Sequence, residues 1–106
     1  MAYDERLADR VRELLAERTD VTERRMFGGL TFMVGGHMCC GINSDELIIR
    51  LAPDAEEAAL TARHARPMDF TRRPMRGFVT IAPEGLKGRS LDSWVAQAIA
   101  LPPKAR

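Results

Sequence analysis

His37, Cys39 and Cys40 are the residues of this 106-residue chain whose types and spacing come closest to a reactive centre. A cysteine beside a histidine can act as a nucleophile, and both types bind metal ions. On a strand, His37 and Cys39 would share one face, with Met38 and Cys40 on the other. Two ligands fall short of the three or four that zinc needs, and no third group is evident to orient a nucleophile. We therefore expect no catalytic residue, metal or cofactor, and keep a reactive site at His37, Cys39 and Cys40 as the alternative.

The two cysteines are adjacent in the sequence. A disulfide between neighbouring residues needs a strained ring, and a secreted domain of this size usually carries several well-spaced pairs. We expect reduced thiols in a reducing compartment. A free cysteine in a strand is more often a small buried apolar residue than a nucleophile.

A second polar candidate is the segment 63–76, which is rich in arginine and carries one acidic residue, Asp69. The guanidinium fork suits carboxylate and phosphate groups, so this segment is a candidate partner-binding surface. Its charge could instead be solvated in a loop or pair with the acidic first half of the chain. Its arginines are Arg63, Arg66, Arg72, Arg73 and Arg76.

The net charge of +1 conceals two halves of opposite sign. Residues 1–60 contain seven basic and twelve acidic residues, whereas residues 61–106 contain nine and three. Direct nucleic-acid binding is an option that this low net charge does not favour, because nucleic-acid-binding domains are usually strongly basic. The absence of a long apolar run excludes a membrane span, and the charged start does not resemble a secretory signal. The expected location is the cytoplasm.

Hydrophobic periodicity predicts an α+β fold of one domain over residues 1–106. An apolar stripe of Leu7, Val11, Leu14 and Leu15 indicates a helix over residues 3–18. Alternation then predicts strands at 22–27, 30–34, 38–42 and 47–51. Their short, glycine-rich or polar connections require antiparallel pairing.

The second half predicts a helix at 53–62, an extended connection over 63–76, a strand at 77–82 and a final helix that begins near Ser90. The expected order is α-β-β-β-β-α-β-α, with about five strands in one antiparallel sheet and the first and last helices against it. A thin core and an exposed sheet edge or face lead us to expect a homodimer.

The run Arg25, Met26, Phe27, Gly28, Gly29 leads into an apolar hairpin that closes at Gly35-Gly36. Together with Pro67-Met68 and the later strand that ends in Pro83-Glu84, this run resembles the TfoX (Sxy) N-terminal domain family over residues 10–100. The resemblance implies an antiparallel sheet with packed helices, similar to the chaperones of type III secretion. It brings no catalytic residues.

The named members of that family regulate bacterial competence genes together with the cyclic-AMP receptor protein and carry a second, helical domain. The resemblance therefore implies a small non-enzymatic interaction module with a regulatory role and a protein partner of unknown identity. The alternative is a ligand-binding protein or enzyme built on His37, Cys39 and Cys40.

Overall fold

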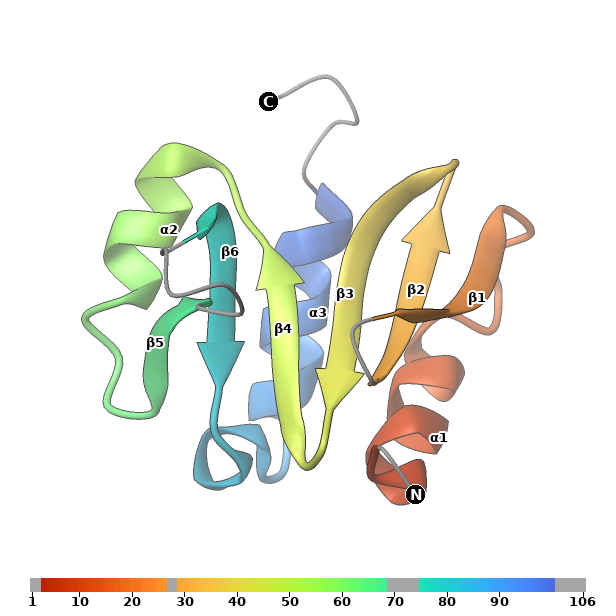
Figure 1. Ribbon diagram of the computed structural model, residues 1–106, viewed down its shortest axis with the longest axis horizontal. Helices are drawn as coiled ribbons and strands as arrows, with labels where there is room; N and C mark the ends of the chain where they lie inside the picture. The colour runs from red at the N-terminus through yellow and green to blue at the C-terminus, as the bar shows by residue number, and fades with distance from the viewer. Residues whose placement is uncertain (1–2, 27–28, 69–74, 101–106) are drawn as a thin grey trace.

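The computed structural model describes residues 3–26, 29–68 and 75–100, which form a six-stranded antiparallel sheet and its flanking helices (Figure 1). The sheet order is β1-β2-β3-β4-β6-β5. The strand bounds are β1 Val21–Met26, β2 Gly29–Val34, β3 His37–Asn43, β4 Glu46–Arg50, β5 Ala65–Met68 and β6 Met75–Ile81. The predicted α+β class and the antiparallel meander are confirmed.

The first two helices are shorter than the sequence predicts. They are α1 Glu5–Leu14, α2 Pro53–Ala59 and α3 Ser90–Ala100, with a short 3-10 turn, η1, at Pro83–Leu86. Asp4 caps the start of α1, where its carboxylate accepts hydrogen bonds from the backbone N–H groups of Arg6 and Leu7. A side-chain oxygen at this position satisfies N–H groups that have no partner within the helix. None of the described helices is long and apolar enough to cross a membrane.

α1 and α3 contact each other and lie behind the sheet in Figure 1, where their apolar stripes form the core with one face of the strands. The cross-strand pairs Phe32–Cys40, Cys40–Ile49 and Ile49–Val79 run along this face. Each of these side chains is almost completely buried. The helices supply Leu7, Val11 and Leu15 from α1 and its C-terminal end, and Leu91, Val95 and Ala98 from α3. Leu14, expected in the apolar stripe, is 37% exposed.

The two hairpins that flank β3 explain the register of the meander. Gly35 and Gly36 have φ angles of +61° and +85°, and they connect the pair Val34–His37. Backbone conformations of this kind match the twist of a two-residue hairpin. Ser44, with φ +57°, turns the chain between Asn43 and Glu46. Each turn fixes which side chains of the following strand face the core.

The segment 63–76 differs from its prediction as an extended connection, because residues 65–68 form the edge strand β5. β5 pairs with β6 and contains Pro67, which lacks an N–H group. Proline is tolerated at a sheet edge, where its missing donor faces away from the ladder. The described sheet therefore has six strands rather than about five.

Candidate functional site

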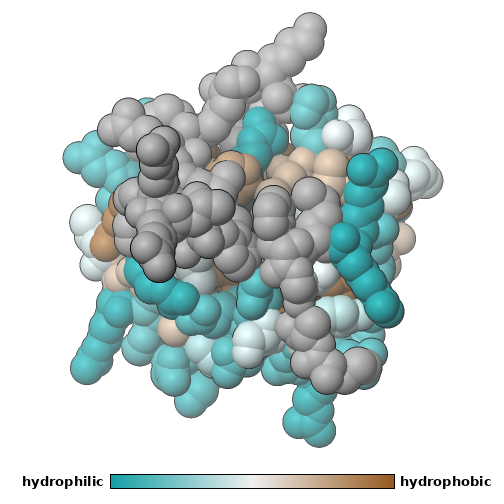
Figure 2. All heavy atoms as spheres, in the orientation of Figure 1, coloured by the Kyte–Doolittle hydropathy of each residue, from teal (hydrophilic) through white to brown (hydrophobic). Residues whose placement is uncertain are grey.

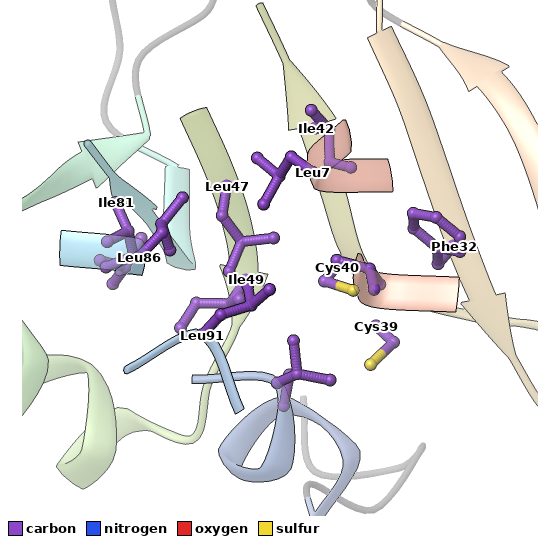
Figure 3. Packing of buried hydrophobic residues seen from close by; sticks show 14 of the residues in the cluster. Leu7, Phe32, Cys39, Cys40, Ile42, Leu47, Ile49, Ile81, Leu86 and Leu91 are labelled. Carbon is purple, nitrogen blue, oxygen red and sulfur yellow. The ribbon is translucent and has the colours of Figure 1, made fainter. Parts of the chain in front are cut away.

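A bulge in β3 sets the positions of Cys39 and Cys40. Phe32 pairs with Cys40 and Met33 pairs with Met38, so Cys39 is an extra residue between the two pairs. An extra residue interrupts the alternation of side chains along a strand. Both cysteines are free, and both belong to the buried core cluster (Figure 3). The strict alternation expected for this strand does not hold at the bulge, since Cys39 and Cys40 both lie in the same buried core cluster.

A hydrogen bond between the two thiols changes them in opposite directions. It lowers the pKa of Cys39, although burial acts against this change and Arg18 and Arg50 add to it. The same hydrogen bond, together with burial, raises the pKa of Cys40 well above its ordinary value. The thiolate is the reactive form of cysteine, so we expect Cys39 to be the more reactive member of the pair. Its side chain is nevertheless enclosed, with 4% of its surface exposed.

We expect both thiols to react slowly with iodoacetamide at pH 8 in the native protein, at least about tenfold more slowly than in denaturant. Cys39 should be modified before Cys40. Mass spectrometry of quenched time points measures the order, and a Cys39→Ser variant identifies the remaining site. If the thiols of the native protein react as fast as those of the denatured protein, the cysteines are not buried. A reactive site at His37, Cys39 and Cys40 then becomes the better interpretation.

His37 does not join the cysteines in the core. It is exposed at the first position of β3, opposite Val34. His64 lies directly before β5, and β4 and β6 separate that strand from β3 in the sheet. Within residues 3–26, 29–68 and 75–100, no three side chains of His, Cys, Asp or Glu gather closely enough to hold a metal ion.

The arginine-rich segment divides into parts with different surroundings. The Arg66 guanidinium contacts both carboxylate oxygens of Glu46, with Nη1–Oε2 at 2.5 Å and Nη2–Oε1 at 2.6 Å. This pair lowers the pKa of Glu46 and connects β5 to the start of β4. Arg63 is exposed. Arg72 and Arg73 lie outside the described residues, and Arg76 is the second residue of β6.

The motif residues that carry the family resemblance lie at the hairpin between β1 and β2. Arg25 is exposed on β1, Met26 ends that strand, and Phe27 and Gly28 lie outside the described residues. Gly29 begins β2 where the β3 backbone comes close, because a Cβ placed at Gly29 would lie 2.1 Å from the Ile42 carbonyl oxygen. This contact gives Gly29 a packing role.

A bidentate ion pair holds β1 against α1. The Arg12 Nε and Nη2 atoms each lie 2.8 Å from an oxygen of Glu23, and Nη1 lies 2.8 Å from Asp9 Oδ1. The Arg12 guanidinium lowers the pKa of Glu23 and keeps this carboxylate ionised. The neighbouring Arg24 and Arg25 are exposed on the same strand. Sequence reasoning did not single out Arg24, although the adjacent Arg24-Arg25 pair could have drawn attention to it.

A shallow groove lies where the start of α1 meets the β3–β4 turn and η1. Its volume of about 290 Å³ is at the lower limit of sites for small organic ligands, roughly 300–1,000 Å³. Sequence reasoning missed this groove, because its residues come from three distant segments. The lining residues are Asp4, Arg6, Leu7, Arg10, Asp45, Pro83 and Leu86.

Most of the described elements lie within a match to a known protein family. The model of the TfoX N-terminal domain matches residues 13–101. This range includes β1 to β6, the hairpin motif at Gly29 and all of α3. No curated protein and no solved structure gives a significant match to the chain.

Proposed function

Because the chain belongs to the TfoX N-terminal domain family, we propose that it is a small non-catalytic interaction module with a regulatory role in a bacterial cytoplasm. The observation that carries this proposal is the family match over residues 13–101. Regulators of bacterial competence genes, which this chain resembles, act through other proteins. The partner proposed here is accordingly a protein.

The surroundings of the polar candidates support an interaction role. Cys39 and Cys40 are packed in the core, where substrates in solution do not reach them. Arg63 and the Arg66–Glu46 pair lie on the surface and offer guanidinium groups to a partner. In Figure 2 the described residues around the border of one face of the molecule are largely hydrophilic. Reduced, buried thiols also fit a cytoplasmic location.

The test replaces Arg72, Arg73 and Arg76 together by Gln and compares partner capture from the native host after crosslinking. Each arginine contact with a carboxylate adds affinity that decreases with salt, so we expect the triple variant to recover less of the partner. A matched control replaces Arg6, Lys87 and Arg89 by Gln. It removes the same charge from exposed positions on α1 and on the connection from η1 to α3.

The melting temperature separates the outcomes. Replacement of a solvated arginine usually changes stability by less than about 0.5 kcal/mol, so the triple variant should remain folded if segment 63–76 is the solvated loop that the sequence allows. A large loss of stability would show that these arginines pair with the acidic half of the chain. Equal capture by both variants would exclude Arg72, Arg73 and Arg76 from the interface, and no captured partner with the wild type would contradict the proposed function.

A further inference from the structure

The two edges of the sheet differ in their capacity to accept another strand. β5, at one edge, has four residues, a proline and a register shift between Pro67 and Met68. β1, at the other edge, pairs with β2 through six consecutive residues without a bulge (Figure 1). β1 contains neither proline nor glycine. Proline, bulges and shortness are among the devices that protect an edge from further pairing, and β1 has none of these three. Its protection is limited to charged side chains, which repel a strand of like charge and attract one of opposite charge.

The hydrogen-bond pattern identifies the backbone groups that β1 presents outward. The Asp20 carbonyl accepts the Gly35 N–H at 3.0 Å, and these residues precede and follow the pair Val21–Val34. Antiparallel ladders alternate between hydrogen-bonded and non-hydrogen-bonded pairs. Thr22 and Arg24 therefore bond to β2. The N–H and C=O groups of Val21, Glu23 and Arg25 point away from the sheet.

The charge on this edge is unbalanced. The Glu23 carboxylate is engaged by Arg12, so it does not neutralise its neighbours. Arg24 and Arg25 are exposed, and within residues 3–26, 29–68 and 75–100 neither guanidinium forms an ion pair. Because consecutive residues of a strand point to opposite faces, one positive charge borders each face of the sheet.

We propose that β1 accepts an extended acidic segment of a partner protein as an additional antiparallel strand. Two consecutive acidic residues in this segment would lie opposite Arg25 and Arg24, one on each face, and its backbone would bond to Val21, Glu23 and Arg25. The inference rests on the proposed function in taking a protein as the occupant. It adds a contact surface at β1, at the edge of the sheet opposite β5, to the one proposed at segment 63–76.

A second copy of the chain is a poorer occupant of the same edge. Symmetric antiparallel pairing centred on Glu23 brings two Glu23 carboxylates opposite each other. Pairing centred on Arg24 brings two Arg24 guanidinium groups opposite each other. It also sets each Arg25 opposite Glu23 of the other copy, but Arg12 already engages that carboxylate. Like charges directly opposite destabilise a strand pair. The charge of β1 therefore favours a segment of opposite sign over its own copy.

Amide exchange of the ¹⁵N-labelled chain tests the proposal with a capped peptide, Ser-Thr-Val-Glu-Glu-Val-Thr-Ser. At a peptide concentration ten times Kd, exchange at Val21, Glu23 and Arg25 should slow by about tenfold. Thr22 and Arg24, already bonded to β2, should change little. A control peptide with Lys in place of both Glu residues should not protect these amides. The protection should weaken as salt rises, because exposed charges are screened.

Two variants separate the backbone contribution from the charge. Arg25→Pro removes one outward N–H group, whereas Arg25→Gln removes the charge alone, and neither change removes a predicted bond to β2. We expect Arg25→Gln to weaken binding and reduce its salt dependence, and Arg25→Pro to abolish protection at Val21 and Glu23. If Arg25→Pro does not fold, Arg25→Gln and the two peptides still decide the result.

Three results would overturn the inference. These are equal binding of the lysine peptide, protection confined to other amides, and a concentration-dependent dimer that protects the same three amides without peptide. The proposed function fails separately. A captured partner that leaves Val21, Glu23 and Arg25 unprotected contradicts the β1 edge alone, whereas the absence of any captured partner contradicts the interaction module.

Discussion

Gly29→Ala is expected to destabilise the protein by about 3 kcal/mol, which is in the upper range for overpacking a close-packed interior. The added Cβ would lie 2.1 Å from the Ile42 carbonyl oxygen. That oxygen belongs to the backbone of β3, so relief of the contact requires movement of a strand rather than rotation of a side chain. The midpoint of urea unfolding, followed by circular dichroism, measures the loss.

Gly36→Ala is the matched control for this substitution. Gly36 has φ +85°, and a Cβ there would meet no atom within 4 Å. The substitution should lower the free energy of unfolding by about 1–2 kcal/mol, because alanine is strained in this left-handed backbone conformation. A smaller effect at Gly29 than at Gly36 would show that β2 and β3 separate easily at this point.

Phe32→Ala should cost about 3–5 kcal/mol of unfolding free energy, as expected for removal of a buried aromatic ring. Phe32 has no exposed surface and lies opposite Cys40 on the face that α1 and α3 cover (Figure 3). Small domains are stable by roughly 5–15 kcal/mol, so this change removes a large share of the total.

Leu14→Ala is the control for Phe32→Ala. Leu14 is 37% exposed at the end of α1, and alanine is a strong helix former, so the expected cost is below about 1 kcal/mol. Thermal unfolding of both variants and the wild type gives the comparison. Similar melting temperatures for the two variants would contradict the central position of Phe32 in the core.

The meander was predictable because residues close together in the sequence determine its strands and turns. Period-two alternation identifies the strands, and turns such as Gly35-Gly36 specify antiparallel neighbours. The bulge at Cys39 was not predictable in this way, because an inserted residue leaves the composition of the strand unchanged. It moves Cys39 into the core beside Cys40, which removes the strict alternation on which the reactive-site alternative depended.

The edge strand β5 escaped prediction for a different reason. Arg66 and Pro67 are typical of a solvated linker. The pairing that makes them a strand comes from Thr80 and Val79 of β6, which follow them by 14 and 12 residues. The Arg66–Glu46 ion pair is likewise a long-range contact. The charge of the segment was visible in the sequence, but the partner of each arginine depends on the topology of the sheet.

The proline and register shift of β5 have a consequence for the size of any assembly built on this sheet. If a strand joins at β1, as proposed, the proline and the register shift oppose a matching addition at β5, so the described part of the sheet offers one receptive edge. Addition of this kind ends after one step, whereas growth into a fibre requires two open surfaces on every unit. On this proposal, the chain can bind a strand at β1 and still form only complexes of limited size.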